Sequence, residues 1–234
     1  MGSELEDIKL LLQKFASLSQ KKHTLCYKVN VGDYAEHDKF IGVSVPILRK
    51  IAKDFINLPL EGITNLVKSP INEERLLALL MLINQYERGD KQLKNEIYKF
   101  YMYNLKYVNN WNLVDSSAHL IAGAHLYNKD KEVLVSLAKS EIVWERRIAI
   151  VSTLDFIRKG KFKWTLKIAE ILLKDTHDLI HKAVGWMIRE VGKRNKEVLV
   201  VFLDRYAACM PRTMLRYAIE KLPKNERESY LNTR

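Results

Sequence analysis

The segment 108–117, VNNWNLVDSS, carries the residue pair with the clearest chemical potential. On a helix, Trp111 and Asp115 are four positions apart and therefore share a face. An aromatic ring face and a carboxylate both stabilise positive charge, so the pair suits a reaction in which such charge develops beside it. A structural alternative stays open, in which Trp111 is a core residue and Asp115 caps a helix.

Two further segments pair a tryptophan with a cation. In WERRIAI, 144–150, Arg147 follows Trp144 by three positions, and its guanidinium could clamp a phosphate through two parallel hydrogen bonds. The alternative is a structural segment in which Glu145 pairs with a neighbouring repeat. In IHKAVGWMIRE, 180–190, Trp186 is flanked at helical spacing by Lys182 and Arg189.

Gly185 precedes Trp186 inside that second segment. Glycine in a helix costs about 1 kcal/mol relative to alanine, so we expect a close approach of another group at this position. Close packing of two helices, with Trp186 in the core, would explain the glycine equally well.

Other common chemistries lack support in the sequence. His177 and His181 have the i, i+4 spacing of metal-binding helices, but no third ligand is evident, and we predict no metal. No Walker A loop, G-x-G-x-x-G, G-x-S-x-G or C-x-x-C motif is present. Cys26 and Cys209 lie far apart, which fits a reducing compartment.

The elements that must position these residues are predicted to be helices. No proline occurs between Ile71 and Met210, and apolar residues recur at helical spacing, as in Leu76, Leu79 and Leu80. The segments beginning at Glu74, Glu145 and His181 carry the same phase, 71 and 36 residues apart. A period in the thirties, with two helices in each unit, predicts an all-α stack of helical repeats that forms one domain. An irregular all-α bundle is the alternative.

Glycines and one loop punctuate this pattern. Gly89, Gly160 and Gly192 each follow an apolar helical stretch, where a left-handed residue would end the helix. We expect one domain over 1–234, with a capping region at 4–54 that contains an irregular loop over 28–43, and stacked helical pairs over 60–234. Pro46 is expected to begin the helix after the loop.

The charge balance indicates a polyanionic partner. The chain has 39 Lys and Arg against 28 Asp and Glu, a net charge of +11, and residues 155–234 carry most of the excess. A basic concave face of a helical stack would follow a phosphate backbone, whereas ordinary charge scatter on a solvated face is the alternative. The net charge alone would fit DNA, RNA or an acidic membrane surface. The apolar runs are too short for a membrane span, and we predict DNA and no membrane as the partner.

With these residues in hand, the sequence resembles the alkylpurine DNA glycosylases built from HEAT-like repeats, the AlkD family. The resemblance spans nearly the whole chain, in the segments FIGVSVPILRKIAK (40–53), NWNLVDSSA (110–118), WERRIAIVST (144–153), IHKAVGWMIREVGKR (180–194) and MPRTMLRYAIEK (210–221). The series W-x-x-x-D, W-x-x-R and K-x-x-G-W carries its specificity.

The resemblance implies an all-α superhelical stack of HEAT-like two-helix repeats that holds duplex DNA in a basic concave groove. It also implies an enzyme of base excision repair without cofactor or metal, and we expect a monomer. Such an enzyme removes cationic N3- and N7-alkylated purines without flipping the base. The catalytic aspartate then falls on Asp115, the sugar-facing tryptophans on Trp111 and Trp186, and the backbone-clamping arginine on Arg147. We expect the protein in the cytoplasm, associated with the nucleoid when it is on DNA.

The remaining DNA-binding residues are expected at Tyr27, Lys182, Arg189, Lys193 and Arg194. In the family, a helix carries the tyrosine near Tyr27 that contacts DNA on the lesion side, but here a glycine-containing stretch follows. This departure keeps a second function open, that of a non-catalytic HEAT-like repeat protein that binds damaged or distorted DNA.

Overall fold

The computed structural model describes residues 2–16, 27 and 33–232. Cys26 and positions 28–32 of the predicted loop lie outside the described residues. Contacts between residues divide the chain into two compact units, Met1–Ser117 and Ala118–Arg234, which are named unit 1 and unit 2. The expected single domain over 1–234 stays a prediction.

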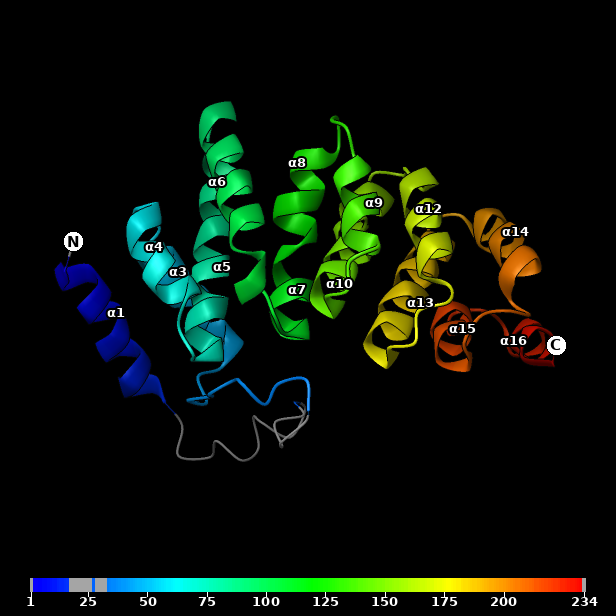
Figure 1. The fold of residues 1–234 in the computed structure, drawn as a ribbon, viewed down its shortest axis with the longest axis horizontal. Coiled ribbons are helices and arrows are strands. Elements are labelled where there is room, and N and C mark those ends of the chain that lie inside the picture. Colours follow the sequence, from blue (N-terminus) through cyan, green and yellow to red (C-terminus); the bar gives the residue numbers. More distant parts are fainter. Residues whose placement is uncertain (1, 17–26, 28–32, 233–234) are drawn as a thin grey trace. The chain divides into compact units, whose positions relative to one another are not determined.

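Unit 1 is built around one buried helix. Its elements are α1 (Gly2–Phe15), α3 (Val45–Asp54), α4 (Leu60–Val67), α5 (Asn72–Arg88), α6 (Lys91–Tyr103), the short 3-10 helix η1 (Leu105–Tyr107) and α7 (Trp111–Ser117). Helices α3, α4, α6 and α7 all pack against α5 (Figure 1). Every residue of α5 from Asn72 to Ile83 is buried, because neighbouring helices surround this helix and leave it no solvent-facing stripe.

Unit 2 arranges its helices in two rows. Its elements are the π-helix η2 (His119–Gly123), α8 (Ala124–Leu126), α9 (Glu132–Ala138), α10 (Val143–Ser152), α11 (Leu154–Arg158), α12 (Lys163–Leu172), α13 (Asp178–Gly192), α14 (Lys196–Tyr206), α15 (Arg212–Ile219) and α16 (Lys224–Asn232). Helices α10, α13 and α15 pack in series in one row, and α9, α12 and α14 form the other (Figure 1).

The predicted helical repeat is confirmed in these elements. The segments that begin at Glu74, Glu145 and His181 lie in α5, α10 and α13, each the second helix of a packed pair. Pro46 occupies the first turn of α3, as predicted, and α4 begins at Leu60, where the stacked pairs were expected to start. The described part of the chain contains no strand, only one isolated parallel bridge between Lys39 and Ile71.

The glycine prediction is right at one of its three positions. Gly160 has φ 71° and is left-handed, whereas Gly89 has φ −69° and Gly192 is the last residue of α13. A Cβ on Gly192 would lie 2.3 Å from Leu199 Cδ2, and one on Gly89 would lie 2.9 Å from Gln85 O and Leu93 Cδ2. These two glycines therefore serve close packing, which a sequence pattern cannot distinguish from a left-handed turn.

Candidate functional site

Helix α7 presents Trp111 and Asp115 on its accessible side. Both residues are half-buried, whereas Asn112, Leu113 and Val114 between them are buried. Asn110 begins the helix, because its Oδ1 accepts from Trp111 N at 2.7 Å and its carbonyl oxygen accepts from Val114 N at 3.1 Å. Asp115 lies inside α7 and not at a helix cap, so the structural alternative of a capping aspartate is wrong.

A buried carboxylate that the sequence analysis missed holds this helix start. Asp38 Oδ2 accepts from Asn110 Nδ2 at 2.6 Å and from Asn72 Nδ2 at 2.8 Å. Its Oδ1 pairs with the Arg75 guanidinium, and no part of the Asp38 side chain is exposed. Asp38 thus ties the segment before α7 to the first turn of α5, with every bond buried.

Two asparagines extend this connection along α7. Asn112 Nδ2 donates to Asn72 Oδ1 at 2.7 Å, and Asn72 Nδ2 approaches Asn112 Oδ1 at 3.4 Å. Arg75 also donates to the carbonyl oxygen of Ser69 at 2.8 Å. We call Asp38, Asn72, Arg75, Asn110 and Asn112 the Asp38 network. Since buried polar groups must be paired, the network fixes α7 in one orientation.

The segment before α3 is also held by hydrogen bonds, in this case to the side chain of Glu73 in α5. Glu73 Oε1 accepts from the backbone N–H groups of Gly42 at 2.8 Å and Ile41 at 3.1 Å, and Gly42 needs its φ of 82° to make this turn. Burial raises the pKa of Glu73, against the opposing effect of these N–H groups. The predicted loop is therefore non-helical over residues 33–42, as expected, yet it is bonded to α5.

Tyr27 lies next to Trp111 of α7 and Phe40 of the segment before α3. Its ring centroid is 5.2 Å from that of Trp111 with an interplanar angle of 20°, and 4.5 Å from that of Phe40. Stacked and tilted pairs at these distances are favourable. The structure thus brings together the predicted DNA-binding residue Tyr27 and the predicted catalytic residue Trp111.

Arg147 in unit 2 has a buried environment. Only 5% of the residue is exposed, Trp144 is 7% exposed, and Arg147 NH1 donates to the carbonyl oxygen of Leu179 in α13. The adjacent Arg146 pairs with Asp175 at 2.6 Å, just before α13. These contacts join α10 to the start of α13, and a phosphate contact by Arg147 stays a prediction.

The other predicted residues form a stripe along α13. Lys182, Trp186 and Arg189 are half-buried and lie on one face of the helix, and Lys193 continues it as an exposed residue. Gly185 sits beneath this stripe, where a Cβ would be 2.4 Å from the carbonyl oxygen of Met214 in α15. The close approach expected at Gly185 is thus a helix–helix contact, and Trp186 is not a fully buried core residue.

Acidic partners accompany every cation of the stripe. Lys182 pairs with Asp178 at 2.6 Å, and Arg189 pairs with Glu220, the C-cap residue of α15. Glu190 pairs with Lys193 at 2.6 Å and with Arg194 at 3.1 Å. Hydrogen bonds from these cations lower the pKa of Asp178 and help to lower that of Glu190, against the opposing effect of burial.

His177 and His181, which have the spacing of a metal-binding helix, are each hydrogen-bonded to a backbone group. His177 is the N-cap of α13, and its Nδ1 accepts from Leu179 N at 3.1 Å. His181 Nε2 is hydrogen-bonded to the carbonyl oxygen of Asp175. Among the described residues, no group of three His, Cys, Asp or Glu side chains could hold a metal ion. Within the same residues, no helix is both long and apolar enough to cross a membrane.

The fold and the site define an all-α helical-repeat protein with an aromatic–carboxylate pair in unit 1 and a cation-bearing helix in unit 2. The chain belongs to the DNA alkylation repair enzyme family, whose model matches residues 11–222. A solved structure described as a predicted DNA alkylation repair enzyme from Enterococcus faecalis is 16% identical. The similarity covers 88% of this chain and 95% of that one, with a TM-score of 0.65. A comparison with curated proteins finds no match.

Proposed function

We propose that the protein is a DNA glycosylase of base excision repair that removes cationic N3- and N7-alkylated purines from duplex DNA. One observation carries the proposal: Trp111 and Asp115 share the accessible side of a helix that a buried network holds in place. Membership of the DNA alkylation repair enzyme family supports alkylated DNA as the substrate.

The chemistry follows from the charge of the substrate. An N3- or N7-alkylated purine already carries a positive charge, so it leaves without protonation. The N-glycosidic bond breaks with its electron pair moving to the purine, and the deoxyribose gains oxocarbenium character. Asp115 stabilises this charge, and Trp111 offers its ring face to the sugar. Water then adds to C1′ and loses a proton, which leaves an abasic site and a neutral alkylpurine.

The proposed reaction needs no cofactor, no metal and no flipped base. Leaving the base in the stack avoids the unstacking cost of base-flipping enzymes. In this proposal Trp186 is the second sugar-facing ring, and the phosphate contacts come from Arg147, Lys182, Arg189, Lys193 and Arg194. Tyr27 contributes through its ring stacked on Trp111. We propose a monomer that acts in the cytoplasm and on the nucleoid.

The experiment is single-turnover release of 7-methylguanine and 3-methyladenine from alkylated duplex DNA. Asp115→Asn keeps the size of the side chain but removes its charge, which matters most in the transition state. We expect release to fall about 100- to 1000-fold, with DNA affinity unchanged or slightly higher. Asp54→Asn is the matched control, because Asp54 is an exposed aspartate at the end of α3.

Two results would contradict the proposal in different ways. Equal rates for the wild type and Asp115→Asn would remove Asp115 from the mechanism. No release by either protein, with DNA binding intact, would favour the alternative of a non-catalytic repeat protein that binds damaged or distorted DNA. The non-helical course of residues 33–42 beside Tyr27 is the observation that keeps this alternative open.

A further inference from the structure

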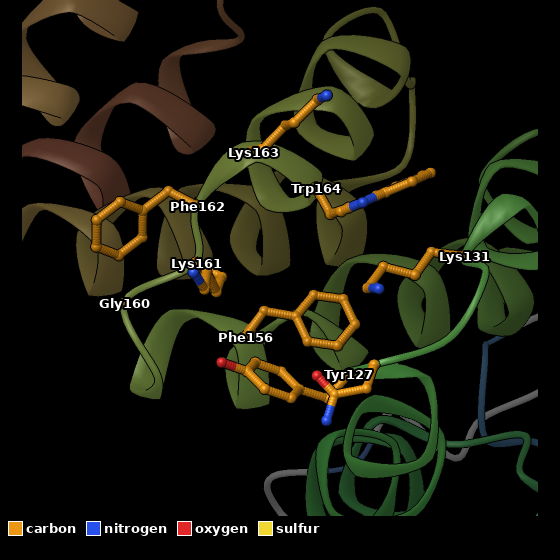
Figure 2. A pocket seen from close by; sticks show the side chains of 9 residues that line it. Tyr127, Lys131, Phe156, Gly160, Lys161, Phe162, Lys163 and Trp164 are labelled. Carbon is orange, nitrogen blue, oxygen red and sulfur yellow. The ribbon is translucent and has the colours of Figure 1, made fainter.

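Unit 2 contains a pocket that the proposed excision chemistry does not use. The pocket has a volume of about 330 Å³ and is formed by the segment after α8, by α11 and by the start of α12 (Figure 2). This volume is at the lower end of the range of small-molecule sites. Helices α10 and α13, which carry Arg147 and the α13 stripe, contribute none of its lining residues.

Aromatic rings make up much of the pocket wall. Figure 2 shows Tyr127 beside Phe156, whose ring centroids are 6.2 Å apart, and Trp164 on the other side of Lys131. Phe156 is 1% exposed and therefore forms a rigid base, whereas Tyr127, Phe162 and Trp164 are half-buried. Figure 2 shows the ring of Phe162 directed away from the other three, so Tyr127 and Trp164 offer the faces on which a flat, aromatic ligand can stack.

The charged residues that line the pocket are all basic. Lys131, Lys161 and Lys163 line the pocket, and no acidic residue does. Of the acids near these residues in sequence, Asp155 pairs with Lys159 at 2.7 Å and Glu132 pairs with Lys167 at 2.9 Å, whereas Asp130 accepts a hydrogen bond from Glu132 N at 3.3 Å. The left-handed turn at Gly160 precedes Lys161 and leaves open space, since a Cβ there would meet nothing within 4 Å.

Two lysines lie over these rings: Lys131, which lines the pocket, and Lys167, which lies outside its lining. Lys131 Nζ lies 5.5 Å from the Phe156 centroid and 6.0 Å from that of Trp164, and Lys167 Nζ lies 4.4 Å from Trp164. A ligand that fits must therefore combine an aromatic plane with a negative group beside it. An uncharged aromatic ligand would leave the ammonium groups without a new partner, and a bare anion would leave the rings uncovered.

We propose that this pocket binds a nucleotide, with the base stacked on Trp164 and the phosphate bonded to one or more of the lysines that line it, Lys131, Lys161 and Lys163. The nucleotide is either a free mononucleotide or an unpaired nucleotide of a DNA strand, which present the same base and phosphate. Binding involves no covalent step and does not depend on excision by Asp115, so either proposal can fail while the other stands.

The test is titration of the full-length protein with dAMP, deoxyadenosine and inorganic phosphate, followed by calorimetry. We expect dAMP to bind at least tenfold more tightly than either fragment. Trp164→Ala should weaken dAMP binding about tenfold or more, since base–aromatic stacking has this magnitude. Lys161→Glu combined with Lys163→Glu should weaken dAMP binding as strongly while leaving deoxyadenosine binding unchanged, and these exposed positions avoid a folding defect.

Lys139→Glu is the matched control, because Lys139 is an exposed lysine of unit 2 outside the pocket. Unchanged dAMP binding by Trp164→Ala and by the double lysine variant would overturn the proposal. Phosphate binding as tightly as dAMP would overturn it too.

The two sources are separated with a duplex that carries a single-stranded tail. Tail-dependent binding that Trp164→Ala abolishes would identify a strand nucleotide. Pocket-dependent binding of dAMP alone would identify a free nucleotide.

Discussion

The surroundings of α7 in unit 1 and of α13 in unit 2 hold their polar side chains in opposite ways. Around α7, the Asp38 network is buried and joins residues 34 to 72 positions apart in the sequence. Along α13, the cations of the stripe are accessible to solvent and pair with acids within four positions or at the C-terminal end of the adjacent helix α15. Buried networks specify one geometry, whereas accessible ion pairs contribute little to stability and exchange partners readily.

This difference matches the two tasks that we propose for the units. A carboxylate that stabilises a transition state must be held in position, and α7 cannot rotate without leaving buried groups unpaired. A cation that binds phosphate must instead release its acidic partner when DNA arrives. The following four predictions test this contrast, from the largest expected effect to the smallest.

The largest effect is expected from Asp38→Ala. Removing this carboxylate leaves the buried Arg75 guanidinium without its ionic partner, which should cost about 3–5 kcal/mol of unfolding free energy. Asp178→Ala, which breaks an accessible pair on α13, should cost less than about 1 kcal/mol. Urea unfolding of both variants measures the two losses of unfolding free energy. Losses of similar size would contradict the contrast between α7 and α13.

Arg147→Ala is expected to have the next largest effect. A buried guanidinium that donates to the Leu179 carbonyl oxygen should contribute about 1.5–3 kcal/mol to the unfolding free energy. Thermal unfolding of this variant is compared with Lys182→Ala, which should change the melting temperature little. A stable Arg147→Ala protein with weakened DNA binding would show that Arg147 makes the proposed phosphate contact but does not stabilise the fold.

The third prediction concerns pH. Burial and the neighbouring Lys129 lower the pKa of His125 in unit 2 to about 4, below its ordinary value of 6.5. The unfolded chain therefore takes up a proton first as the pH falls, and stability decreases between about pH 6.5 and 4, by up to about 1.4 kcal/mol per pH unit. Glu73 in unit 1 has a raised pKa, so acid acts on that group in the stabilising direction.

Thermal unfolding at several pH values checks this prediction. His125→Gln should flatten the acid dependence relative to the wild type, whatever its stability at neutral pH. An unchanged slope would mean that His125 is not the group that titrates.

The smallest effect is expected from the Lys182–Asp178 pair. Lys182→Ala should reduce the log–log salt slope of DNA binding by about 0.9, the loss of one phosphate contact. Asp178→Asn should raise DNA affinity, because it frees Lys182 from its partner. Fluorescence anisotropy with duplex DNA at several salt concentrations measures both variants. If both leave the slope and the affinity unchanged, the α13 stripe does not contact the backbone.

The sequence predicts local structure well and long-range polar contacts poorly. Helical periodicity and phase identify α5, α10 and α13, because those patterns depend on residues within a few turns of one another. The asparagines in VNNWN place polar groups beside Trp111 in the sequence. Nothing in the residues around Asp38 indicates that it binds them. Its partners come from two other parts of the chain, and only the fold brings them together.

Arg147, Gly89 and Gly192 show a second limit of prediction from the sequence. A charged side chain after a tryptophan fits an accessible clamp and a buried helix connector equally well, and burial separates the two. Gly89 and Gly192 resemble turn residues in the sequence, although neighbouring side chains are what exclude a Cβ there. For Arg147 the missing information is its neighbour in α13, and for the two glycines it is how the chain places residues four to seven positions away.

The reach of the Asp38 network also affects the order in which the protein folds. The accessible pairs of α13 that span three or four positions can form as soon as that helix winds, within microseconds. The bonds of Asp38 to Asn72 and Asn110 close loops of 34 and 72 positions, and they gain stability only after α5 and α7 have docked. We therefore expect the start of α7, and with it the orientation of Trp111 and Asp115, to be among the last parts of unit 1 to reach native geometry.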